Sequence, residues 1–186
     1  MKKLLFLAAT MLLTIAAFAE TIPANDSRVT YVGRTLVEGT NVSFDWTATY
    51  FRIAFSGKSL TMRASESKWD ADAEKAATRH NYYNVWIDSP TSAEPHRIIE
   101  VAGNDTVIEL IDPMYLKKSR RAVHEVIVQK RTEGEQGKTT IHEFATNKKG
   151  KFFQAEPLKV RQLEFIGDSY TCGYGIDAKS RLERFS

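Results

Sequence analysis

Residues 50–64 read YFRIAFSGKSLTMRA and contain the clearest structural signal in the chain. The run from Tyr50 to Phe55 is rich in aromatic and β-branched residues, which favour strands. A turn signal, Ser56-Gly57-Lys58, follows it, and Ser59 to Ala64 is a second β-like run. Two such runs joined by a short glycine-containing turn predict a β-hairpin.

Similar short runs lie on both sides of this stretch. Residues 42–46 and 82–88 alternate apolar and polar side chains with the period of a strand. Two more hairpins are predicted, one joining 97–101 to 106–111 and one joining 123–130 to 139–144. About eight or nine short strands in about 120 residues predict a mainly β protein, a β-sandwich or jelly roll.

Two segments interrupt this pattern. Residues 67–79 (SKWDADAEKAATR) have a helix-favouring composition but a weak apolar face, so a helix and a solvated loop both remain open. Residues 146–157 (TNKKGKFFQAEP) are polar and end in proline. We interpret them as a junction that ends a sandwich domain of residues 20–150, with another hairpin loop as the alternative.

The N-terminus has the pattern of an export signal. Lys2 and Lys3 precede an apolar run from Leu4 to Phe18, and Ala19 completes a small-x-small cleavage site. Residues 1–19 are therefore predicted to be a signal peptide cut after Ala19, which predicts a secreted or periplasmic protein. The apolar run is short for a membrane span, so no membrane association is expected after cleavage; an uncleaved anchor is the alternative.

Composition excludes several classes of protein. With 42% hydrophobic and 26% charged residues the chain is globular rather than disordered. The net charge of +3 falls to +1 without Lys2 and Lys3, and no basic stripe suggests nucleic-acid binding. The single cysteine cannot form an internal disulfide, so a hydrophobic core must hold the fold. The oligomeric state is not predicted.

Residues 163–175 read LEFIGDSYTCGYG and carry the candidate chemistry. A strand predicted over 160–166 ends in a tight turn that would expose the Ser169 hydroxyl at the carboxyl edge of a sheet. Gly167 permits the sharp turn, and Gly173 keeps the mouth of the site open. The backbone N–H of Ser169, at the start of a helix, could stabilise a tetrahedral oxyanion.

Residues 165–175 resemble the first sequence block of the SGNH, or GDSL, hydrolases, and most of all that of the family 2 carbohydrate esterases. The strings at 31–34, 55–60, 85–88 and 124–131 also resemble this family. The resemblance implies a jelly-roll domain followed by an SGNH catalytic domain that begins near residue 158. It also implies that Ser169 is the nucleophile, that its backbone N–H is one oxyanion donor, and that Asp168 shapes the turn.

The resemblance further implies an exported serine esterase that deacetylates plant-type polysaccharide, acting on acetylated polysaccharide or oligosaccharide through an acyl-enzyme, with no metal or cofactor. The family supplies its base from a later histidine block and further oxyanion donors from later glycine and asparagine blocks. Each βαβ unit takes about 30 residues, more than the eleven that follow Gly175. We therefore expect an inactive fragment; a non-catalytic carbohydrate-binding module is the alternative function.

Other chemistry-bearing residues are expected to be structural. His124 and His142 lie on strand patterns and should be satisfied structural residues, while His80 and His96 lie near loops and should be solvated. No two histidines have metal-ligand spacing.

The remaining sulfur and aromatic side chains divide in the same way. Cys172 should pack behind the serine turn. Trp46 and Trp86 should lie in the core, whereas Trp69 is the candidate for an exposed, sugar-binding aromatic. Tyr170 and Tyr174 could line a cleft or simply pack.

Overall fold

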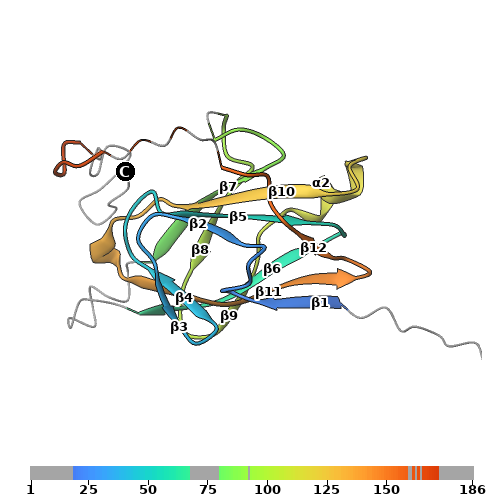
Figure 1. The fold of residues 1–186 in the computed structure, drawn as a ribbon, viewed down its shortest axis with the longest axis horizontal. Helices are drawn as coiled ribbons and strands as arrows, with labels where there is room; N and C mark the ends of the chain where they lie inside the picture. Colours follow the sequence, from blue (N-terminus) through green and yellow to red (C-terminus); the bar gives the residue numbers. More distant parts are fainter. Residues whose placement is uncertain are drawn as a thin grey trace, which may run out of the picture.

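Strict alternation gives the long strands one inward face. Buried and half-buried residues alternate along β6 (Leu60–Ser67) and β10 (His124–Lys130). The computed structural model describes residues 19–67, 80–91, 93–158, 161, 163 and 165–171. Within these residues two six-stranded antiparallel sheets face each other across the buried side chains (Figure 1). The predicted mainly β, jelly-roll sandwich is confirmed.

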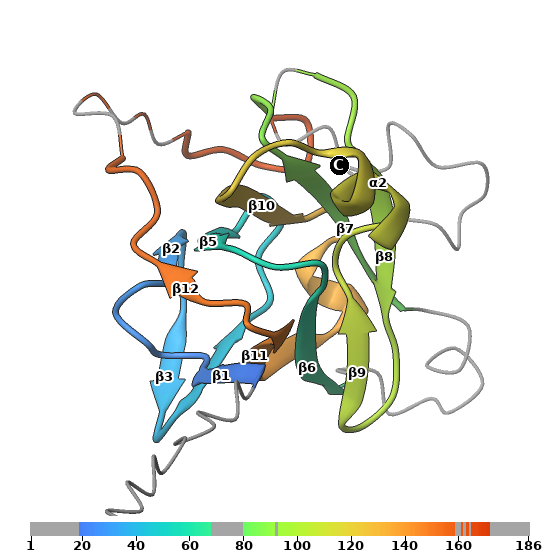
Figure 2. The same cartoon turned by 90° about the vertical axis from the view of Figure 1, so that its right-hand side faces the viewer.

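In each sheet the spatial order of the strands differs from their order in the sequence. In the first sheet the order is β3 (Leu36–Glu38), β4 (Asn41–Phe44), β11 (Lys138–Lys148), β6, β9 (Thr106–Glu109), and β1 (Ala19–Pro23) also pairs with β11. In the second it is β12 (Phe152–Phe153), β5 (Tyr50–Phe55), β10, β7 (Asn81–Ile87), β8 (Arg97–Val101), and β2 (Thr30–Val32) also pairs with β5. Figure 2 shows the two layers, with the short helices α2 (Pro113–Lys118) and η1 (Gly134–Gln136) in connections between them.

The three predicted hairpins are wrong, because each short turn crosses from one sheet to the other. β5 pairs with β10 in the second sheet, whereas β6 pairs with β11 in the first. The turn between them is held by a distant segment: Ser56 N donates to Lys151 O at 2.8 Å. Gly57 has a φ of 125°, and a Cβ there would lie 2.5 Å from Asn147 Oδ1. The turn residues were identified correctly, but they form a corner between sheets.

Large aromatic side chains join the two sheets. The rings of Phe51 on β5 and Phe144 on β11 lie 5.1 Å apart between centroids, and both are fully buried. Tyr83 on β7 donates its hydroxyl to Thr139 Oγ1 on β11 at 2.6 Å. Burial raises the pKa of the Tyr83 phenol, while the hydrogen bond to Thr139 acts in the opposite direction. Each buried side chain of this kind contributes about 1.5–3 kcal/mol to folding.

The segment predicted as a domain junction belongs largely to the sandwich. Residues 146–148 are the end of β11, and β12 pairs with β5 in the other sheet. Ala155 beyond β12 is also buried. The predicted boundary at residue 150 therefore falls between two strands of one fold.

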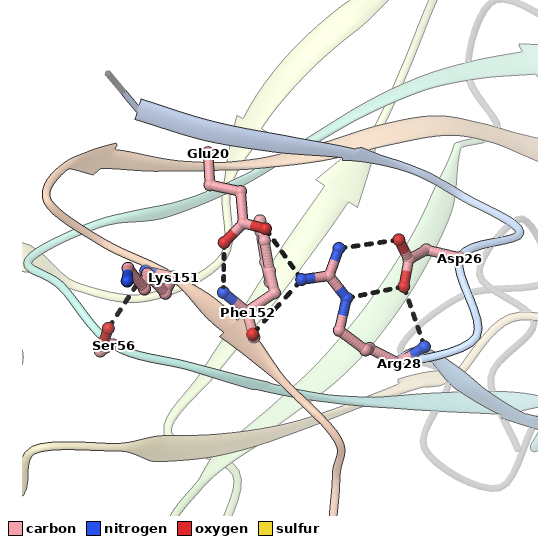
Figure 3. Close-up of polar contacts among 6 residues, drawn as sticks. All are labelled: Glu20, Asp26, Arg28, Ser56, Lys151 and Phe152. Atoms are coloured by element: carbon pink, nitrogen blue, oxygen red, sulfur yellow. Dashed lines mark hydrogen bonds and ion pairs between the residues drawn. The ribbon is translucent and has the colours of Figure 1, made fainter. Parts of the chain in front are cut away.

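A polar network ties the start of this fold to β12 (Figure 3). Glu20 on β1 accepts the backbone N–H of Phe152 at 2.7 Å and the Arg28 guanidinium at 2.8 Å. Arg28 also donates to both carboxylate oxygens of Asp26, and these hydrogen bonds lower the pKa of Asp26. Glu20 is the first residue after the predicted signal cleavage, so cleavage there would leave the network intact.

Several predictions fall outside the described residues. These are most of the leader (1–18), the segment 68–79 with Trp69, and residues 172–186 with Cys172, Gly173 and Tyr174. Among the residues that the structure does describe, no helix is long and apolar enough to cross a membrane.

Candidate functional site

The chain leaves the sandwich over the outer side of the second sheet. Glu156 donates its backbone N–H to Glu125 Oε2 on β10 at 3.2 Å. The other Glu125 oxygen accepts Arg52 Nε from β5 at 2.8 Å. The hydrogen bond from Glu156 to Glu125 holds the chain against the sandwich just before the segment that carries Ser169.

Local contacts shape the turn at Ser169. Asp168 Oδ1 accepts the backbone N–H of Tyr170 at 3.0 Å, and Asp168 O accepts the N–H of Thr171 at 3.1 Å. A Cβ at Gly167 would lie 2.1 Å from Thr171 Oγ1, so only glycine fits against this side chain. The Asp168 carboxylate thus holds the turn, and Ser169 lies exposed within it.

The apolar side chains around this turn face solvent. Phe165 is 80% exposed and Ile166 91% exposed, and Leu163 and Tyr170 are exposed to a similar degree. The described residues of the predicted strand 160–166 have no strand pairing. Several exposed apolar residues close together in the chain can mark an interaction surface.

All four histidines have partners in the sandwich. His124 is buried and bonded to Asp88, and His142 lies at a bulge in β11 between Ser65 and Asn41, so both are structural as predicted. His80 and His96 are half-buried rather than solvated. His80 pairs with Glu66 and Glu100, and His96 accepts the backbone N–H of Asp112. Burial lowers the pKa of His96, with Arg97 acting in the same direction and Asp112 against it.

The Asp88–His124 pair superficially resembles a catalytic dyad. Asp88 Oδ2 lies 2.6 Å from His124 Nδ1, and Asp88 has a positive φ of 54°. The His124 ring, however, is only 3% exposed and packs against Phe55 and Tyr115. A base must reach the proton it removes, and this imidazole is enclosed on the core side.

A hollow of about 480 Å³ lies beside this pair on the outer side of the second sheet. Most of its charged lining is paired: Arg52 pairs with Glu125, and Arg121 lies 3.8 Å from Asp88. None of its lining residues is aromatic. The hollow therefore lacks a flat surface on which a sugar ring could stack.

Trp46 is the exposed aromatic of the described sandwich that the sequence interpretation missed. It was predicted to lie in the core with Trp86, but the Trp46 side chain is 58% exposed, whereas Trp86 is buried as expected. The Arg34 guanidinium lies 5.4 Å from the Trp46 ring centroid. On β10, Lys130 lies in phase with Val126 and Val128, so the strand buries a lysine, and in the structure this lysine contacts the loop of Trp46 through Asp45 O.

Metal chemistry finds no support in this part of the chain. Across the residues that the structure describes, no group of three or more His, Cys, Asp or Glu side chains could hold a metal ion. The expectation that the protein needs no cofactor stays a prediction.

Comparison with known proteins assigns the sandwich to a family. Residues 31–156 match the family model described as carbohydrate esterase 2 N-terminal. The chain belongs to carbohydrate esterase family 2. The match ends at Glu156, the residue whose backbone contact with Glu125 closes the sandwich.

Relatives of this family 2 chain include a curated acetylxylan esterase / glucomannan deacetylase from Cellvibrio japonicus, 32% identical over 155 residues, which are 80% of this chain and 36% of that protein. The solved structure of a family two carbohydrate esterase from the same organism has a TM-score of 0.70 at 22% identity, covering 90% of this chain and 44% of that chain. A family two esterase from Clostridium thermocellum, solved in complex with cellohexaose, has a TM-score of 0.64 at 21% identity and covers 85% and 42%. The chain thus spans less than half the length of these relatives.

Proposed function

We propose that the protein is an exported serine esterase of SGNH type that removes acetyl groups from plant-type polysaccharide. The observation that carries the proposal is the glycine-tight turn that exposes Ser169, attached to a family 2 sandwich. The Cellvibrio japonicus relative is named as an acetylxylan esterase and glucomannan deacetylase, which supports an acetylated main-chain sugar as the substrate. The N-terminal leader supports export.

The chemistry proposed for Ser169 is acyl transfer in two steps. Its Oγ attacks the acetyl carbonyl carbon while a base takes the hydroxyl proton, and the sugar oxygen leaves with that proton. Water then attacks the acetyl-serine, releasing acetate and restoring the serine. The backbone N–H of Ser169 would donate to the oxyanion in both steps. Asp168 positions this turn through its bond to Tyr170 and is not the base.

The base is proposed to come from polypeptide beyond the sandwich. His124 and His142 are tied into the sandwich, and His80 and His96 have partners there. The exposed Phe165 and Ile166 also need a covering layer that a catalytic domain of the family would supply. On this proposal the 186-residue chain alone does not hydrolyse esters.

The test uses the protein extended to the length of its family relatives. We expect Ser169→Ala to lower the rate of acetate release from acetylated xylan by about 10⁴-fold or more, as for removal of a nucleophile that acts in a unit. Ser89→Ala, which removes a serine of the sandwich, is the matched control and should retain activity. Retained turnover in Ser169→Ala would contradict the proposed nucleophile. Turnover by the 186-residue chain that is lost in Ser169→Ala would contradict its proposed inactivity.

The non-catalytic binding module is a second candidate for the isolated chain. The exposed Trp46 favours it, because a large aromatic at the surface of a sandwich can stack on a sugar ring. The two candidates are compatible in a longer protein, where the sandwich would bind the chain that the esterase deacetylates.

A further inference from the structure

The connection between β4 and β5, residues 45–49, presents one large side chain to solvent. Trp46 is 58% exposed there, although tryptophan is highly buried on average. An exposed tryptophan needs no explanation when it stands on a loosely held loop. The loop of residues 45–49, however, is held by several polar contacts to Lys130 and to the connection that follows β10.

Lys130 supplies the main support. Its side chain is buried at the end of β10, and its Nζ donates to Asp45 O at 2.7 Å, Thr132 O at 3.0 Å and Glu133 O at 3.0 Å. The ammonium thereby joins the loop of Trp46 to the connection that follows β10. Burying a lysine is unfavourable unless its charge is well satisfied. One of the carbonyls that satisfy the buried Lys130 charge belongs to Asp45, the residue directly before Trp46.

Further contacts fix the rest of the loop. The Thr47 hydroxyl lies 3.1 Å from Thr132 O and 2.9 Å from Glu133 Oε2. The backbone N–H of Ala48 donates to Lys130 O at 2.9 Å, and Ala48 itself has a φ of 63°. A left-handed conformation at a residue other than glycine persists only where its surroundings determine it. The loop is therefore rigid, and Trp46 is presented in a set direction.

Arg34, two residues after the end of β2, contacts the exposed Trp46 ring. Gly33 has a φ of 114° and approaches the loop so closely that a Cβ would lie 2.7 Å from Thr49 Oγ1. This approach places the Arg34 guanidinium 5.4 Å from the Trp46 ring centroid. The guanidinium lies over one face of the indole in a favourable cation–π contact, which leaves the opposite face for a ligand.

We propose that Trp46 forms a polysaccharide-binding subsite on the sandwich, in which a pyranose ring of the main chain stacks on the indole face opposite Arg34, and Arg34 holds the indole in place. The choice of ligand rests on the proposed function for its substrate class. A flat indole on a loop held by several hydrogen bonds is an arrangement that can orient a neutral sugar ring. The subsite lies on the sandwich and does not require the nucleophile turn.

The test measures binding by the 186-residue chain to deacetylated xylan and glucomannan in affinity electrophoresis, and to xylo- and manno-oligosaccharides by calorimetry. We expect Trp46→Ala to weaken binding at least tenfold, Trp46→Phe less, and Arg34→Ala severalfold. Phe153→Ala, an exposed aromatic on β12, is the matched control and should bind as the wild type. Because Arg34, Trp46 and Phe153 are all exposed, all four variants should keep the wild-type circular dichroism spectrum.

Three results would overturn the subsite. These are wild-type affinity in Trp46→Ala, no binding of any of these glycans by the wild-type chain, or equal losses in Trp46→Ala and Phe153→Ala. A fourth is a Trp46 contribution to acrylamide quenching, taken as the difference between wild type and Trp46→Phe, that is smaller in the extended protein than in the short chain, which would show that polypeptide covers this ring. The esterase proposal fails separately: Ser169→Ala that keeps turnover contradicts it whether or not Trp46 binds sugar.

Discussion

The sandwich and the Ser169 segment differ in what determines their structure. In the sandwich, Phe51 and Ile53 are fully buried between two sheets. In the Ser169 segment, Phe165 and Ile166 are at least 80% exposed, and the turn is held by the side chain of its own Asp168. The sandwich is therefore defined by long-range packing, whereas the turn at the candidate nucleophile is defined by local contacts and its apolar neighbours are exposed.

The largest expected effect is the difference in free energy of unfolding between a truncation in the sandwich and one in the Ser169 segment. Phe51→Ala should lower the free energy of unfolding by about 3–5 kcal/mol, because it removes the ring that packs on Phe144 and Tyr31. Phe165→Ala should change it by less than about 0.5 kcal/mol, since that side chain is exposed. Urea unfolding of both variants measures the difference.

Phe51→Leu guards against complete loss of folding in the alanine variant and should give a smaller decrease. If Phe165→Ala destabilised the chain as much as Phe51→Ala, the Ser169 segment would be packed and the contrast would be broken.

A smaller effect concerns Lys130, which supports the Trp46 loop. Burial lowers its pKa to about 8, while Asp45, Glu133 and Glu66 act in the opposite direction. Between about pH 8 and the ordinary lysine value of 10.5, the unfolded chain holds a proton that the folded chain has released. Stability rises with pH wherever the unfolded state binds more protons.

The wild-type chain should therefore gain free energy of unfolding relative to Lys130→Met as the pH rises from about 8 to 10.5. At neutral pH, Lys130→Met should still be less stable by about 1–3 kcal/mol, because three buried carbonyls lose their donor. Lys151→Met removes an exposed lysine and reports the general effect of one charge. A difference between wild type and Lys130→Met that falls over this pH range would contradict the assignment.

The sequence predicted the strands better than their pairing. Period-two alternation in β6 and β10 depends only on neighbouring residues, so their inward faces could be identified. Whether the turn at Gly57 makes a hairpin or a corner depends on Asn147 and Lys151, which lie far away in the sequence. Local patterns cannot supply that information.

The candidate sites were predictable to different degrees. Ser169 could be named as a candidate from sequence because its turn chemistry is local and its motif is continuous, and its role as nucleophile stays a prediction. Trp46 was misplaced because residues 42–46 alternate like a strand, although β4 ends at Phe44. The cause is the buried Lys130, whose contact with Asp45 O turns the chain out of the sheet. That contact joins residues 85 positions apart, beyond the reach of any local pattern.

Hydrogen exchange read by mass spectrometry tests the contrast between the two regions most directly. In the 186-residue chain, peptides from β10 and β11 should be the last to exchange, because both strands are paired on two sides. A peptide over 163–171 should exchange at the earliest time point, and it should become protected in the extended protein. Slow exchange of 163–171 in the short chain, comparable to that of β10, would contradict the account.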